Sequence, residues 1–140
     1  MAYATWKSSL ETGDPLVDAE HREIFALVNR LHDSIVQCHE RAMQDDILAL
    51  IVEKARAHFA HEEALMRSIR YPGLLDQRRM HKEFVAETGR LAAQYQSGEK
   101  RLPINLAMFL HQWLVTHMRV EDRKIGEFIR ARAAEEQTAT

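Results

Sequence analysis

The sequence has little cysteine, glycine or proline, and it has no long apolar run. One cysteine among 140 residues, Cys38, excludes an internal disulfide, and a lone thiol near a helix end is more often inert than catalytic. We assign it no role. Five glycines and three prolines leave long stretches without helix breakers. No apolar run approaches the roughly 20 residues that span a bilayer, so no membrane association is expected.

The chain also has no large excess of positive or negative charge. The 19 basic and 21 acidic side chains are scattered along the chain and give a net charge of -2, with no basic block to neutralise a run of phosphates. Nucleic acid is therefore not an expected partner, and nothing indicates an obligate protein partner. The first six residues do not follow the charged-then-apolar pattern of a signal peptide, so a cytoplasmic location is expected.

What the sequence does contain is helical periodicity. Hydrophobic residues make up 46% of the chain, and in four stretches they recur at the three- and four-residue spacing of one helical face. The expected helices run from about Asp18 to His39, from Asp45 or Asp46 to Ile69, from Leu74 to Tyr95, and from just after Pro103 past Phe128. Four such helices with short links predict an all-α fold, an antiparallel up-down-up-down four-helix bundle that forms a single domain over residues 1–140.

The two ends of the chain lack this periodicity. Residues 1–17 are expected to form an extended N-terminal arm in which Trp6 packs as an anchor. Small and charged residues dominate after about Ala131, and residues 132–140 are expected to fray.

Histidine is abundant, with eight residues, and several of them fall on the apolar faces of the expected helices. A single inward histidine is usually a satisfied core residue, and an isolated buried glutamate would cost several kcal/mol. Donors that all four helices aim at one level of the bundle are better explained by a metal site. These inward donors are His21, His58, Glu62, His81 and His117.

Spacing along the helices distinguishes strong from weak candidates. His58 and Glu62 are four residues apart, so both project from one face. Asp122 lies five residues beyond His117, about 140° around a regular helix, and reaches the same centre only through a favourable side-chain path or a local bulge. Geometry alone leaves Asp122 equally open as a ligand or a solvated residue. His111 points to another side of its helix, and His61 adjoins the donor face without sharing it, so both are expected at the surface.

The donor types indicate which metals would bind. Imidazole nitrogens and carboxylate oxygens suit iron, manganese or zinc, and no inward cysteine favours thiolate-seeking ions. Four imidazoles and two carboxylates exceed what one tetrahedral zinc requires. They fit a dinuclear site in which the carboxylates bridge two ions.

Several stretches of the chain resemble the bacterial haemerythrins, and the resemblance covers nearly the whole sequence. They are Asp18-Ala-Glu-His21, His58-Phe-Ala-His-Glu62-Glu-Ala-Leu-Met66, Tyr71-Pro72 and Trp113-Leu-Val-Thr-His117-Met-Arg-Val-Glu-Asp122. The resemblance implies a four-helix bundle that binds O₂ reversibly at two iron ions joined by an oxo or hydroxo bridge.

The same resemblance implies a role for each donor. His21 and His58 would hold the iron with the open O₂ position, and His81 and His117 would hold the other iron. Glu62 and Asp122 would bridge the two irons. The family pattern thus favours Asp122 as a ligand where geometry left it open.

The chain departs from the family pattern at Gln77, where a further histidine is expected one turn before His81. Gln77 could coordinate, water or an anion could fill the position, or the second iron could be held weakly. A vacant or water-filled position is favoured, because an amide competes poorly with water for iron. Both irons would then bind small molecules such as peroxide or nitric oxide. This hypothesis predicts that Gln77→His raises the iron content or prolongs the oxygenated form.

Three functions are compatible with these features. The leading one is a non-enzymatic protein that binds O₂, or another small diatomic ligand, for storage, delivery or sensing, with no catalytic residue. A di-iron enzyme acting on peroxide or nitric oxide is the second, and an additional open position would favour it. The third is a helical interaction module that has lost its metal, for which Gln77 is the indication.

Overall fold

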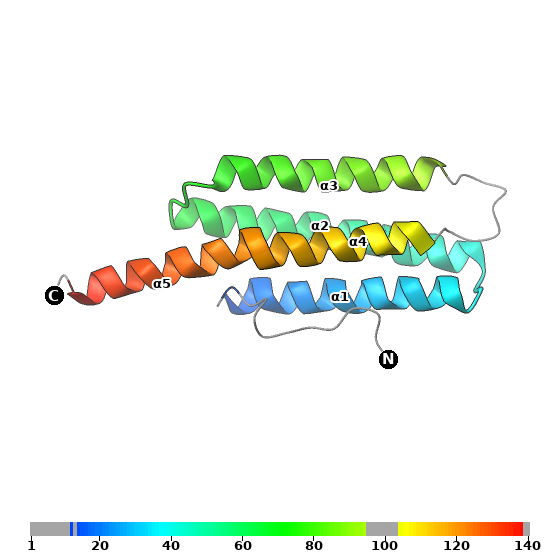
Figure 1. The fold of residues 1–140 in the computed structure, drawn as a ribbon, viewed down its shortest axis with the longest axis horizontal. Helices are drawn as coiled ribbons and strands as arrows, with labels where there is room; N and C mark the ends of the chain where they lie inside the picture. The colour runs from blue at the N-terminus through cyan, green and yellow to red at the C-terminus, as the bar shows by residue number, and fades with distance from the viewer. Residues whose placement is uncertain (1–11, 13, 95–103, 139–140) are drawn as a thin grey trace.

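Four long helices pack side by side in the computed structural model, which describes residues 12, 14–94 and 104–138. They are α1 (Pro15–Val36), α2 (Arg41–Ser68), α3 (Leu74–Gln94) and a last helix composed of α4 (Ile104–Thr116), the π-helical segment η2 (His117–Asp122) and α5 (Arg123–Thr138). Both α1 and α3 contact α2 and α4, and successive helices run in opposite directions (Figure 1). The expected all-α four-helix bundle is confirmed, and Trp6 lies outside the described residues.

The start of α1 shows how local chemistry sets a helix boundary. Asp14 caps the helix, because its side chain accepts a hydrogen bond from the backbone N–H of Val17 at 3.0 Å, and Pro15 follows in the first turn. The expected start at Asp18 was therefore wrong. Asp18 is buried, and its Oδ1 accepts hydrogen bonds from the backbone N–H and the hydroxyl of Thr12 at 2.7 and 2.9 Å.

The first two helices end without a glycine at the left-handed position. Cys38 and Arg70 each adopt a left-handed backbone with φ of 56° just after α1 and α2, the position at which helices commonly end. The adjoining backbone bonds, from His39 to Ser34 and from Tyr71 to Met66, satisfy carbonyls of the last turns. Short closures of this kind keep the helices antiparallel and adjacent.

The apolar faces predicted from periodicity form the core. Ile24, Val28, Leu31, Ile51 and Leu110 are all almost fully buried and belong to one hydrophobic cluster. This cluster fills the half of the bundle nearer the α1–α2 turn. The histidines and carboxylates lie toward the opposite half, near the start of α1 and the α2–α3 turn, which separates the polar centre from the main apolar core.

The last helix continues beyond its expected end near Ala131. It is helical through Thr138, and Figure 1 shows α5 extending past the end of the other helices. Residues 130–137 are exposed. None of the described helices is both long and apolar enough to cross a membrane.

Candidate metal centre

All six sequence-predicted donors meet inside the bundle, and every helix contributes at least one. His21 comes from α1, His58 and Glu62 from α2, His81 from α3, and the remaining two, His117 and Asp122, from the two ends of η2. No donor is more than 5% exposed. Six buried polar side chains at one level would be unfavourable in a bundle of this size unless they were paired or bound to an ion.

The donors form two groups that share the carboxylates. In the first group, His21 Nε2 lies 3.4 Å from Glu62 Oε2 and 3.2 Å from Asp122 Oδ2. His58 Nε2 lies 2.9 Å from the same Glu62 oxygen. Four donor atoms, two nitrogens and two oxygens, therefore surround one position.

The second group uses the other oxygen of each carboxylate. His81 Nε2 lies 3.3 Å from Glu62 Oε1 and 3.1 Å from His117 Nε2. His117 Nε2 in turn lies 3.3 Å from Asp122 Oδ1. Glu62 and Asp122 thus direct one oxygen to each group, as carboxylates that bridge two cations do.

The π-helical segment explains how Asp122 reaches the centre. In an α-helix, Asp122 would point about 140° away from His117. Because η2 adopts the wider i→i+5 register, residues five apart lie nearly on the same face. The structure therefore contains a local bulge, one of the two arrangements that the sequence geometry left open.

The donor atoms fit metal coordination better than hydrogen bonding. Neighbouring ligands at about 2.1 Å from an octahedral ion lie roughly 3 Å apart, close to the spacings in both groups. Both Glu62 oxygens, His58 Nε2 and Asp122 Oδ2 are buried yet have no correctly oriented hydrogen-bond partner among the described residues. Two hard or borderline cations would satisfy these atoms, and the nitrogen and oxygen donor set suits iron.

Two further carboxylates support the histidines from outside, and sequence reasoning missed both. Glu20 accepts a hydrogen bond from His58 Nδ1 at 3.2 Å and is 2.7 Å from Nδ1 of the exposed His61. Glu63 accepts from His81 Nδ1 at 3.0 Å. By holding the proton on Nδ1, each carboxylate leaves Nε2 available as a metal ligand.

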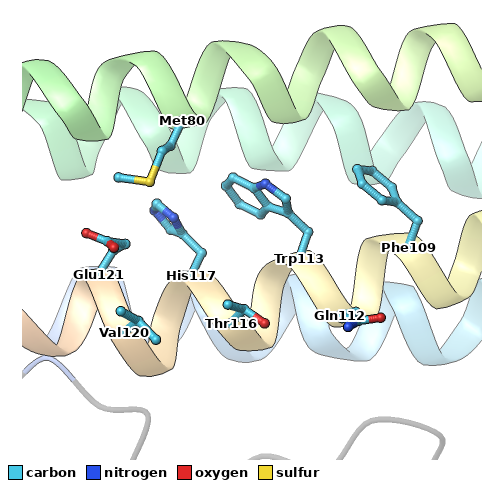
Figure 2. Close-up of a pocket in the computed structure, with 8 residues that line it drawn as sticks. All are labelled: Met80, Phe109, Gln112, Trp113, Thr116, His117, Val120 and Glu121. Atoms are coloured by element: carbon cyan, nitrogen blue, oxygen red, sulfur yellow. The ribbon is translucent and has the colours of Figure 1, made fainter.

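Aromatic rings fix the second pair of histidines. The rings of Phe59 and His81 are stacked, 4.0 Å apart and 7° from parallel. Trp113 stacks on His117 at 4.5 Å and 13°. Figure 2 shows Trp113, His117 and Met80 facing a groove of about 410 Å³ between α3 and the last helix.

Gln77 lies beside the second group and is 1% exposed. Its Nε2 donates a hydrogen bond to Asp122 Oδ1 at 3.4 Å, while its Oε1 has no hydrogen-bond partner in the described part of the chain. The two histidines expected at the surface, His61 and His111, do not join either group. His61 is exposed, and His111 is partly buried with its ring 6.3 Å from that of Phe25.

Opposite charges compensate one another inside the centre. Burial alone would lower the pKa of His21, but the carboxylates of Asp122 and Glu62 outweigh burial and raise this pKa from 6.5 to about 9. Burial alone would raise the pKa of Glu62, but the neighbouring imidazoles of His21, His58 and His81 hold it well below 4.5. Glu62 also raises the pKa of His81 against the opposing effect of burial.

These shifts predict the pH dependence of the metal-free protein. The raised pKa of His21 contributes stability that is complete below pH 6.5 and is lost as pH rises through about 9. The lowered pKa of Glu62 contributes stability that is complete above pH 4.5 and is lost on acidification. We expect maximal stability between pH 4.5 and 6.5, with a loss of roughly 3 kcal/mol toward pH 9, at about 1.4 kcal/mol per pKa unit.

Denaturant unfolding of chelator-treated protein at pH 6 and pH 9 measures this loss. The variant His21→Gln should lose less unfolding free energy between pH 6 and pH 9, because it removes the imidazole proton that the carboxylates stabilise. Equal or greater stability at pH 9 in the unsubstituted protein would contradict the expected charge pairing.

Comparisons with known proteins agree with this geometry. Residues 12–129 match the family model described as "Hemerythrin HHE cation binding domain". "Bacteriohemerythrin" of Stenotrophomonas maltophilia (strain R551-3) is 29% identical over 131 residues, which cover 94% of this chain and 84% of the relative. "Myohemerythrin" of Riftia pachyptila is 29% identical over 119 residues, covering 85% and 88%. A solved structure, "Crystal structure of hemerythrin:wild-type", matches with a TM-score of 0.81 and 26% identity, covering 90% of this chain and 97% of the other.

Proposed function

Because the chain belongs to the haemerythrin HHE cation-binding family, we propose that its buried centre holds two iron ions and binds O₂ reversibly. The chain is accordingly a non-haem di-iron protein. When bound, the ions supply the redox chemistry that allows O₂ to be taken up and released. The protein supplies the donors, their orientation and an enclosure that limits access of water.

This proposal rests on the directions in which the two carboxylates present their oxygens. Glu62 and Asp122 each present one oxygen to His21 and the other oxygen to the second histidine pair. A single metal ion would leave one oxygen of each carboxylate, and two imidazoles, without a partner. We therefore assign both carboxylates as bridges between two ions.

The histidines divide between the two ions in the same way. We assign His21 and His58 to one ion and His81 and His117 to the other. The two group memberships in the structure support this assignment. By the family pattern, the ion held by His21 and His58 carries the open position for O₂.

Buried apolar side chains next to the centre limit access of water to it. Ile24 and Phe25 follow His21 by about one turn, and Leu114 precedes His117 by about one turn. Their low-dielectric surroundings disfavour charged species and bulk water near the ions. We infer that these walls slow loss of the oxygenated state by oxidation.

The alternative functions are less favoured. The relatives carry the names of bacterial and muscle-type haemerythrins, which favours reversible O₂ binding over turnover of peroxide or nitric oxide. The buried, unsatisfied donor atoms also disfavour an interaction module that has lost its metal, because such a module gains nothing from keeping them.

Iron quantification combined with optical spectra tests the proposed function. Protein reconstituted under reducing conditions should contain two irons per chain. Its spectrum should develop an oxo-bridge band in air and should change reversibly on cycling between O₂ and argon, with dithionite restoring the reduced form after oxidation. One iron per chain, or a spectrum that never responds to O₂, would contradict it.

Glu20 provides a separate prediction about how the centre is supported. Glu20→Gln removes the charged acceptor of His58 Nδ1, and loss of such an outer partner typically weakens metal binding about 10- to 100-fold. We expect faster iron loss to a chelator together with a shift of the optical band. Glu23→Gln is the matched control, because Glu23 is exposed on the same helix and pairs with Lys54 at 3.1 Å. Equal iron retention in both variants would show that Glu20 does not support His58.

A further inference from the structure

The buried amide of Gln77 faces the second histidine group, and its carbonyl oxygen is not used as an acceptor by any described residue. Its Nε2 donates to Asp122 Oδ1, and its Oε1 has no hydrogen-bond partner among the described residues although the side chain is 1% exposed. A buried polar atom left in this state is unfavourable. A hydrogen-bond donor such as water would satisfy Oε1, and Nε2 has a second N–H that can donate to an acceptor in the same space.

The ion held by the second group has coordination positions to spare. The protein offers it two imidazoles, from His81 and His117, and one oxygen from each carboxylate. Non-haem iron with imidazole and carboxylate ligands takes up to six donors. A bridging oxo or hydroxo group would supply a fifth donor, which leaves one position for a ligand from outside the chain.

The histidines of this group are not free to turn and occupy that position. Phe59 stacks on one imidazole and Trp113 on the other, and Glu63 holds Nδ1 of His81. Each ring would have to give up its stacking partner in order to move. The remaining position thus stays next to the Gln77 amide.

The surface groove in Figure 2 reaches one ligand of the second group. His117 lines the groove, and Met80, which follows Gln77 by about one turn of α3, points toward the His117 ring. Methionine is unbranched and adapts its conformation easily, so Met80 can move aside for a small ligand. Two ferric ions bring more positive charge than two carboxylates neutralise, which favours an anion.

We propose that the ion held by His81 and His117 binds a small monovalent anion in the position beside Gln77, with the Gln77 amide N–H donating a hydrogen bond to it. In the absence of such an anion, water occupies the position and donates to Gln77 Oε1. This inference rests on the proposed function, because it requires two irons. It assigns the centre a second exogenous-ligand position, in addition to the one that takes O₂.

Azide titration of the oxidised, iron-loaded protein tests this position. Calorimetry and the azide-to-iron absorption band should give two azides per two irons in the unsubstituted chain. Gln77→His should reduce this number to one, because the imidazole fills the position. Gln77→Leu should retain two azides but bind the second about tenfold more weakly, since it removes the hydrogen bond. Gln94→His, the same substitution at an exposed site on α3, is the control and should still bind two.

The outcomes separate this inference from the proposed function. One azide in the unsubstituted protein, with two irons and reversible O₂ binding intact, overturns only the second position. Two azides in Gln77→His, with that variant folded and fully loaded, also overturn it. A single iron per chain overturns both proposals. If Gln77→His does not fold, the weakened second azide in Gln77→Leu still tests the role of the amide, and unchanged affinity counts against it.

Discussion

Replacing Glu62 with glutamine is expected to lower iron binding from two ions per chain to less than one and to abolish reversible O₂ binding. Glu62 lies within 3.4 Å of His21, His58 and His81 and directs its two oxygens to different groups. An amide offers one neutral oxygen where two oxygens that share one negative charge are needed. We expect metal affinity to fall more than about 100-fold, beyond the loss caused by removing an outer partner.

Iron content after chelator challenge and the O₂-dependent spectrum measure this effect. Glu53→Gln is the matched control, because Glu53 is exposed on the same helix, and it should retain two irons. Circular dichroism of the metal-free variants separates loss of ligands from loss of fold. A folded Glu62→Gln protein with two irons and a normal spectrum would remove the basis for assigning Glu62 as a bridge.

Deleting single residues from the last helix is expected to have opposite effects at two exposed positions. Removing Val120 from η2 places Asp122 four residues after His117, and in an α-helix residues four apart share a face. The π-helical segment can then become α-helical with both donors still directed inward. We expect this variant to keep two irons.

Removing Gln112 from α4 should abolish iron binding. There the helix is already regular, so loss of one residue turns His117 and Asp122 by about 100° relative to Leu106 and Leu110. Either the donors or the apolar face must then leave the interior. Iron content and helicity of the two deletion variants measured side by side check the prediction. Loss of both irons from a folded Val120 deletion, or two irons in the Gln112 deletion, would contradict it.

The fold was predictable because periodicity reports burial directly. The apolar residues that recur at helical spacing are the ones that fill the core, and the inward donors were found by the same rule. Helix ends were less predictable, because several residues can cap a helix. Asp14 and Asp18 are both good caps by residue type, and Pro15 is the signal that favours Asp14.

Interactions between helices account for what the sequence left open. Glu20 and Glu63 look like surface residues on their own helices, and they become relevant because His58 and His81 come from other helices. Glu20 and His58 are separated by 38 residues, so no local pattern connects them. The position of Asp122 depends on a change of helical register that periodicity does not reveal. The family resemblance, rather than spacing, indicated that residue.

The raised pKa values of His21 and His81 have a consequence for the order of maturation. With its pKa raised to about 9, the His21 imidazole is expected to hold a proton beside Asp122 and Glu62 at neutral pH in the metal-free chain, where a cation binds later. Iron uptake is then an exchange that releases acid. We therefore expect the bundle to fold before it binds iron, unlike a zinc finger, which has no stable fold without its metal.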